Sequence, residues 1–129
     1  MRLIDALQYR LPLAGLVSLL HRVSGGVLFV LLPFVIWLFD ASVTSEISFE
    51  RFRGAFEDGI GVVPAPLIKL VVLALIWSTL HHLIAGVRHL WMDITHSITK
   101  EAGRASAAVT LGVSLLLTVA LGAKLFGAF

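Results

Sequence analysis

Three long apolar stretches limit what this chain can fold into more than any other feature of its sequence. They run over residues 13–39, 66–92 and 105–126, and a bilayer core of about 30 Å needs roughly 20 apolar residues per helix. Mean hydropathy is +0.97 and charged residues make up 14% of the chain, against about 25% in a soluble domain. We therefore expect an all-α integral membrane protein, a single membrane-anchor domain over residues 1–129 with three transmembrane helices.

Composition excludes several classes of function. The sequence has no cysteine, so the chain holds neither a disulfide nor a cysteine-ligated zinc ion or iron–sulfur cluster. Its net charge is only +2 and it contains no basic block, so we expect no nucleic-acid binding. The first twelve residues do not resemble a cleaved signal peptide, and Arg2, Asp5 and Arg10 predict a short surface segment before the first span.

The segment between the first two spans has a pattern of its own. Four apolar residues recur at helical spacing on one face, namely Phe49, Phe52, Phe56 and Ile60. This predicts a short interfacial helix lying on the membrane surface, and the alternative is a helix packed on a soluble partner domain. Pro33 predicts a kink in the first span, and Pro66 suits the first turn of the second.

Lysine and arginine residues predict the orientation in the membrane. The side that holds the N-terminus and the second loop carries six of them: Arg2, Arg10, Arg22, Arg88, Lys100 and Arg104. The other side carries four: Arg51, Arg53, Lys69 and Lys124. Cytoplasmic loops are enriched in positive residues, so we expect a cytoplasmic N-terminus in a bacterial inner membrane.

Polar residues gather in two places that are distant in sequence. One group lies near the start of the first span and comprises Ser18, His21, Arg22 and Ser24. The other lies near the end of the second span and comprises His81, His82, Arg88, His89 and Asp93. Because consecutive spans are antiparallel, both groups should meet at one depth near the cytoplasmic face. Ionisable groups within a span are costly and by default suggest function.

Helical spacing suggests what the second group could bind. His82, Gly86, His89 and Asp93 fall on one stripe, so an imidazole lies one turn from a position without a side chain. A haem needs an axial imidazole and a smooth wall. The alternatives are interfacial histidines, a glycine used for helix packing and arginines that extend to the lipid headgroups. We interpret His81 and His96 as interface histidines, and Trp77 and Trp91 as lipid-facing aromatic residues.

The remaining polar side chains suit a quinone or a haem carboxylate. Arg22 and Arg88 are fixed cations suited to haem propionates or a quinone carbonyl. The Ser18 hydroxyl can donate a hydrogen bond to a quinone oxygen. His89 and Asp93, at i and i+4, could orient each other or relay protons.

Two motifs resemble those of a known family, the cytochrome b membrane anchors of succinate dehydrogenase (succinate:quinone oxidoreductase, respiratory complex II). Ser18-Leu-Leu-His21-Arg22-Val-Ser24-Gly25 is similar to the family's S-x-x-H-R-x-S/T-G. The stretch from His82 to Asp93 is similar to its H-x-x-x-G-(aliphatic)-R-H-x-x-x-D. The resemblance covers nearly the whole chain, including Arg10 and Pro12 of an R-x-P near its start.

The resemblance implies a set of roles. His82 would be one axial ligand of haem b, and a second hydrophobic anchor subunit would supply the other. Ser18 and Arg22 would line a ubiquinone site against the iron–sulfur subunit, which receives electrons from a flavoprotein subunit. Four residues would lie near the haem propionates or the iron–sulfur subunit, namely His21, Arg22, Arg88 and His89, with Gly86 and Asp93 in support.

Two other functions remain compatible with the residues. The chain could be a self-contained b-type cytochrome with both haem ligands of its own, for example His21 with His82. It could also be a haemless membrane anchor or assembly subunit whose polar cluster only docks a partner.

Overall fold

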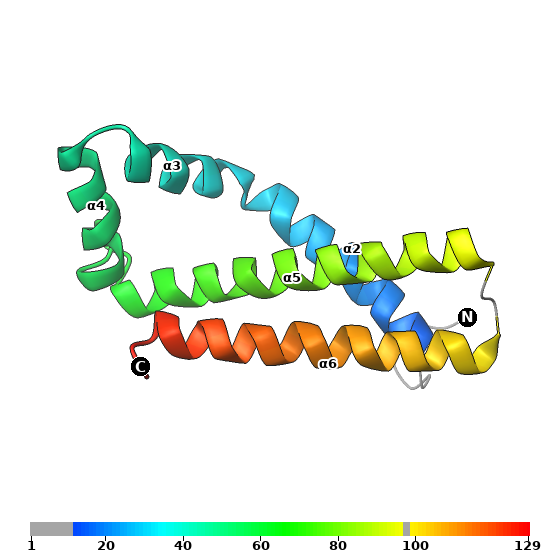
Figure 1. Ribbon diagram of the computed structural model, residues 1–129. Coiled ribbons are helices and arrows are strands. Elements are labelled where there is room, and N and C mark those ends of the chain that lie inside the picture. The colour runs from blue at the N-terminus through cyan, green and yellow to red at the C-terminus, as the bar shows by residue number, and fades with distance from the viewer. Residues whose placement is uncertain (1–11, 97–98) are drawn as a thin grey trace, which may run out of the picture.

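The computed structural model describes residues 12–96 and 99–129, and over these residues the chain forms helices and no strand. Figure 1 shows their arrangement, with bounds α2 Leu13–Val30, α3 Leu32–Val43, α4 Glu46–Glu57, α5 Ala65–Thr95 and α6 Lys100–Leu125. Three of them, α2, α5 and α6, are long and apolar enough to cross a membrane. The predicted class is therefore confirmed, while the surface segment expected over residues 1–11 lies outside the described residues.

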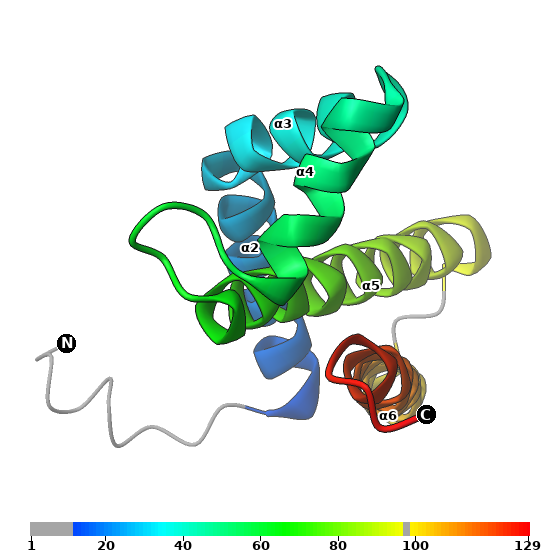
Figure 2. The same ribbon diagram turned by 90° about the vertical axis from the view of Figure 1, so that its left-hand side faces the viewer.

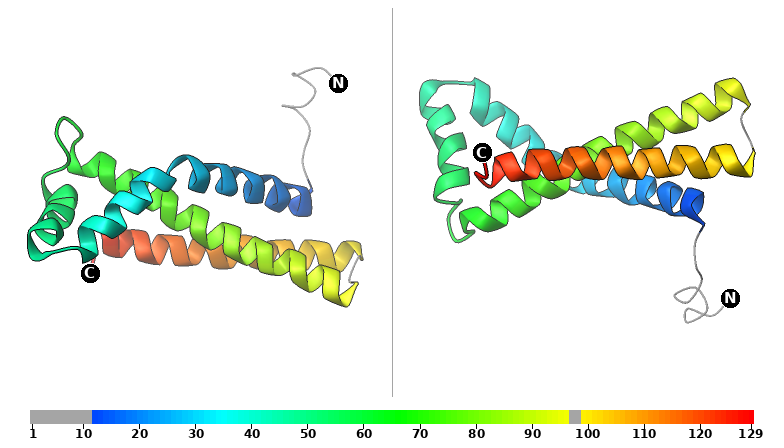
Figure 3. Two further views of the ribbon diagram at one scale, coloured as in Figure 1. Left: turned by 90° about the horizontal axis from the view of Figure 1, so that it is seen from above. Right: turned by 60° about the horizontal axis from the view of Figure 1, so that its bottom comes forward.

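The three long helices pack side by side, with α2 crossing α5 and α6 running antiparallel to α5 (Figures 1 and 3). The start of α2 lies at the same end of the bundle as the end of α5 and the start of α6 (Figure 1). The C-terminus and α4 lie at the other end. The antiparallel arrangement expected for the spans is confirmed, so the start of the first span and the end of the second share one level.

The first span is bent, because residues 13–39 form two helices. Leu31 separates α2 from α3, with φ −88° and ψ 2°, and Pro33 occupies the first turn of α3. Proline has no N–H to donate to the carbonyl four residues earlier, and its ring clashes with that carbonyl, so the helix cannot run unbroken through this turn. The kink expected at Pro33 is therefore confirmed, with the break lying just before the proline.

The helix expected between the first two spans is α4, which runs across the end of the bundle against α3 and α5 (Figure 2). The side chains of Ser45 and Ser48 cap its first turn reciprocally. Three of its aromatic rings contact one another in sequence: Phe49 stacks on Phe52, and Phe52 meets Phe56 edge to face. Ile60 was expected on the same face, but the helix ends at Glu57 and Ile60 pairs with Val63 in the turn that follows.

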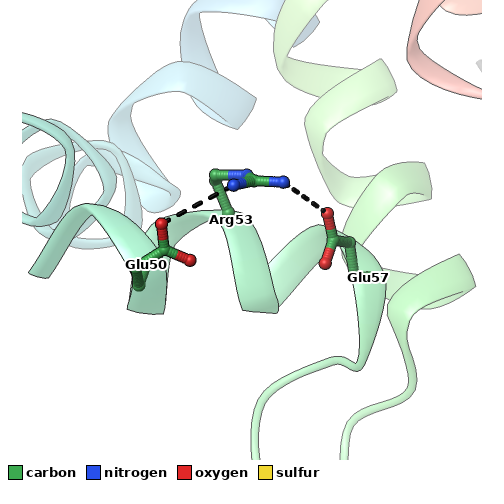
Figure 4. Close-up of polar contacts among 3 residues, drawn as sticks. All are labelled: Glu50, Arg53 and Glu57. Carbon is green, nitrogen blue, oxygen red and sulfur yellow. Dashed lines mark hydrogen bonds and ion pairs between the residues drawn. The ribbon is translucent and has the colours of Figure 1, made fainter. Parts of the chain in front are cut away.

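Charged side chains cover the adjoining face of α4. Arg53 lies 3.6 Å from a carboxylate oxygen of Glu50 and 3.3 Å from one of Glu57 (Figure 4). All three side chains are largely exposed, so these ion pairs contribute little stability. An apolar face beside a charged one, on a helix that runs across the ends of the spans, agrees with a position along the membrane surface.

Small residues hold the long helices close together. Val17 of α2, Ala85 of α5 and Ala107 of α6 are completely buried where the three helices meet. The buried positions of α6 recur every three or four residues and are all small, namely Gly103, Ala107, Thr110, Ser114, Thr118 and Gly122. Such residues let membrane helices approach closely. The same contact also buries polar side chains of α5.

Candidate functional site

Three histidines meet where α2 crosses α5. The rings of His21 and His82 stack, with centroids 4.2 Å apart and planes 16° apart. The ring of His89 is tilted by 52° to that of His21, with centroids 5.3 Å apart. The two polar groups that are distant in sequence therefore lie together, as the antiparallel spans predicted.

The hydrogen bonds of His82 determine which of its ring nitrogens carries the proton. Nδ1 lies 3.1 Å from the backbone carbonyl oxygen of His21, which can only accept. The hydroxyl of Ser24 lies 3.2 Å from the same nitrogen and itself donates to that carbonyl at 2.7 Å. Nδ1 must therefore carry the hydrogen, and the lone pair of the neutral ring is on Nε2. A histidine held in this way by a backbone carbonyl is typical of a metal ligand.

Two glycines border the stacked rings, but only one of them is closely packed. A Cβ on Gly25 would lie 3.0 Å from Cε1 of His82, so the ring occupies the space that a side chain would need. A Cβ on Gly86 would lie 3.8 Å from Nε2 of His21, an ordinary contact. Gly25 is therefore the glycine that lets α2 accept the ring of His82.

The two residues expected to contact a quinone lie on α2 beside this cluster. Ser18 and Arg22 are one turn apart, and Gly25 follows at the spacing that places all three on one side of the helix. Ser18 is half-buried and Arg22 is exposed. Within residues 12–96 and 99–129, neither side chain has a hydrogen-bond partner.

His89 and Asp93 do not interact in the described part of the chain. No hydrogen bond or ion pair joins them there, and Asp93 is exposed while His89 is half-buried beside His21. The structure therefore brings His89 into the histidine cluster and leaves Asp93 at the end of α5.

Arg88 contacts α6 rather than the histidine cluster. Its side chain is buried, with Nε donating to the Ser106 hydroxyl at 2.9 Å and Nη2 donating to the Gly103 carbonyl at 3.2 Å. The guanidinium expected near haem propionates thus hydrogen-bonds within the α5–α6 pair.

His81 was expected at the membrane interface, and this expectation is wrong. The residue is completely buried between α2 and α6. Its Nδ1 lies 3.3 Å from the Ser114 hydroxyl and its Nε2 lies 3.5 Å from the Val17 carbonyl. Trp77, expected to face lipid, is half-buried and stacks on the His81 ring with centroids 5.3 Å apart. By contrast His96 and Trp91 are exposed, as expected.

Sequence reasoning missed the polar side chains of α6 that hydrogen-bond to residues of α5. Ser106 and Ser114 contact Arg88 and His81, although nothing in their own surroundings in the sequence suggests a role. The signal that could have found them is the row of small residues in α6 at intervals of three or four. Such a row marks the face that packs on a neighbouring helix.

The geometry also bears on a cytochrome with both ligands in one chain. Two axial ligands must approach an iron from opposite sides along one line. The rings of His21 and His82 instead lie face to face at 4.2 Å, so no macrocycle fits between them. This arrangement argues against His21 with His82 as the two ligands of one haem.

Comparison with known proteins gives one consistent result. Residues 4–121 match the family model described as succinate dehydrogenase/fumarate reductase transmembrane subunit. The chain is 32% identical over 111 residues to the succinate dehydrogenase cytochrome b556 subunit of Paracoccus denitrificans, covering 86% of this chain and 80% of that protein. It is also 32% identical over 119 residues to the protein of that name from Coxiella burnetii, covering 92% and 90% of the two chains. The cytochrome b560 subunit of Reclinomonas americana is 26% identical over 111 residues, covering 86% and 76%.

Proposed function

Because the chain belongs to the succinate dehydrogenase/fumarate reductase transmembrane subunit family, as a cytochrome b membrane subunit of succinate dehydrogenase, we propose that His82 is one axial ligand of haem b. Such a subunit is part of an oxidoreductase complex and is not catalytic alone. The observation that carries the proposal is the hydrogen bond from Nδ1 of His82 to the carbonyl of His21, which leaves Nε2 free to ligate iron.

The second axial ligand comes from another chain in this proposal, the second hydrophobic anchor subunit. Each of the other four histidines is placed unsuitably: His21 stacks on the His82 ring, His81 is enclosed between helices, His89 lies beside His21, and His96 ends α5. None of them can approach an iron from the side opposite to His82. A haem between two different anchor chains is the arrangement that fits these positions.

Ser18 and Arg22 form the quinone-binding part of the site in this proposal. Ser18 would donate its hydroxyl hydrogen to one carbonyl oxygen of ubiquinone. Arg22 would stabilise the negative charge that develops on the quinone as electrons arrive from the iron–sulfur subunit. Haem b, when bound, would serve as a one-electron carrier close to this site. The half-buried Ser18 and the exposed Arg22, one turn apart, support this assignment.

Replacing His82 tests haem ligation. In the purified complex, His82→Ala is expected to abolish or strongly alter the Soret and α bands of the reduced-minus-oxidised spectrum, because the iron loses a ligand. His96→Ala removes an exposed histidine outside the cluster and serves as the matched control, with unchanged bands. Wild-type bands in His82→Ala would contradict the assignment and favour a different ligand, whereas absence of the bands from the wild-type complex would favour a haemless anchor.

Replacing Ser18 and Arg22 tests the quinone site. Ser18→Ala and Arg22→Leu are expected to slow succinate-to-quinone electron transfer by about tenfold or more, since each loses a group that stabilises charge on the substrate. Succinate oxidation with a soluble dye, which does not use this site, should persist. An equal loss of both activities would show that the two residues support assembly instead.

A further inference from the structure

Two consecutive histidines of α5 hydrogen-bond to backbone carbonyls of α2 that are one turn apart. Nε2 of His81 lies 3.5 Å from the oxygen of Val17, and Nδ1 of His82 lies 3.1 Å from the oxygen of His21. Carbonyls four residues apart in a helix are separated by about 6 Å along its axis. The two contacts together fix both the height and the rotation of α5 against α2.

His81 also contacts the third helix of the bundle. Its Nδ1 lies 3.3 Å from the hydroxyl of Ser114 in α6, and the ring of Trp77 stacks on it. The side chain is completely buried. A polar ring in such a place is stabilised only by its hydrogen bonds, so its position is determined by α2 and α6 together.

The two adjacent histidines must carry their protons on different nitrogens. The carbonyl of Val17 accepts only, so a neutral His81 ring that is hydrogen-bonded to it carries its hydrogen on Nε2. Its Nδ1 then accepts from Ser114, whose hydroxyl hydrogen turns to this nitrogen from the Leu111 carbonyl, 3.2 Å from the same hydroxyl. His82 carries its hydrogen on Nδ1, which leaves Nε2 as the nitrogen with the lone pair. His81 therefore has both nitrogens engaged within the bundle, whereas His82 has one engaged and one available.

We propose that His81 is a positioning residue, which holds α5 between α2 and α6 so that His82 meets the His21 carbonyl and presents Nε2 in a fixed direction. This inference rests on the proposed role of His82 as a haem ligand. The hydrogen bond behind an axial imidazole and the orientation of its ring affect the electronic properties of the iron. A change at His81 should therefore alter the spectrum and potential of the haem without touching the ligand itself.

The test compares variants of His81 and Ser114 in the assembled, purified complex. His81→Phe keeps a ring of similar size but removes both hydrogen bonds, and His81→Gln keeps one amide donor and one amide acceptor. Haem content, the position of the α band, the low-spin electron paramagnetic resonance spectrum and the haem midpoint potential are measured. We expect His81→Phe to shift the resonance spectrum and the potential, His81→Gln to restore them in part, and Ser114→Ala to shift them in the same direction by less.

Each outcome decides the inference. Wild-type resonance spectra and potential in both His81→Phe and Ser114→Ala would overturn the positioning role. Loss of haem in His82→Ala would in that case still support His82 as the haem ligand. Wild-type bands in His82→Ala would overturn the ligand and this inference with it. Where His81→Phe fails to assemble, Ser114→Ala decides, because it removes one partner and leaves the buried ring in place. His96→Ala should match the wild-type protein in every measurement.

Discussion

Gly25 determines how closely the ring of His82 can approach α2. The ring lies against the backbone of Gly25, where a Cβ would be 3.0 Å from Cε1, and this is tighter than side chains normally pack. Gly26 follows it on α2, and a Cβ there would meet nothing within 4 Å. Two adjacent glycines in one helix thus differ in what a side chain would meet: at Gly25 it would meet the proposed haem ligand, and at Gly26 it would meet open space.

A pair of alanine substitutions separates these two positions. Gly25→Ala should displace the His82 ring, and overpacking of this kind costs about 1–3 kcal/mol. We therefore expect roughly a tenfold loss of haem affinity, equivalent to about 1.4 kcal/mol, measured as haem bound per complex when haem is limiting. Gly26→Ala should bind haem normally, because alanine favours the helix and the position is open. Equal haem content in the two variants would contradict the role given to Gly25.

Single residues also show where prediction from sequence ends. His82 could be placed toward the first span, because it shares a helical face with Gly86 and His89 and because antiparallel spans bring the two polar groups to one level. The surroundings of His81 could not be predicted in the same way. Adjacent residues in a helix point about 100° apart, and only the position of α6 decides whether His81 meets lipid or Ser114.

At the scale of helices, the contact between α5 and α6 is more polar than the sequence suggested. Arg88 donates to Ser106 and to the carbonyl of Gly103, and its side chain is buried. A buried guanidinium is stabilised only while its donors are paired. The last turns of α5 are therefore joined to the first turns of α6 by hydrogen bonds as well as by close packing.

Ser106→Ala tests this connection between the two helices. The substitution leaves Nε of Arg88 without its partner, and a hydrogen bond to a charged group contributes about 1.5–3 kcal/mol. We expect a lower Tm for the detergent-solubilised complex, with unchanged haem bands. Thr79→Ala removes an exposed hydroxyl of α5 and is the control. Altered haem potential with an unchanged Tm would instead favour the propionate role that the sequence suggested for Arg88.

The helices themselves were predictable from their apolar runs, and their ends were less so. The second span begins as Pro64 and Pro66 indicate, but α5 continues past residue 92 to Thr95. α6 begins at Lys100, ahead of the predicted 105, because the Thr99 side chain accepts from the Ala102 N–H and caps a polar first turn. Hydropathy marks the part of a helix that lies in lipid, whereas capping residues determine where the helix ends.

At the scale of the whole molecule, the two ends of the bundle differ in what they carry. The histidine cluster joins His21, in the first half of α2, to His82 and His89, in the second half of α5. These halves lead to the end of the bundle that holds the start of α2 and the start of α6 (Figure 1). The amphipathic α4 and the C-terminus lie at the other end. By sequence, the side of the membrane that holds the N-terminus and the second loop carries six lysine and arginine residues against four, which predicts that this side faces the cytoplasm. The proposed quinone site would then lie on the side where succinate is oxidised.

Cysteine labelling tests this orientation without background from this chain, because its sequence contains no cysteine. Val62 is fully exposed in the turn before α5, and Glu101 is exposed at the start of α6. A membrane-impermeant maleimide should label Val62→Cys in intact cells and Glu101→Cys only after the membrane is permeabilised. Labelling of both in denaturing detergent controls for a partner subunit that covers either position. The reverse pattern would place the histidine cluster on the outer side. A quinone bound beside Arg22 could not then receive electrons from a cytoplasmic iron–sulfur subunit, and the proposed quinone site would be contradicted together with the orientation.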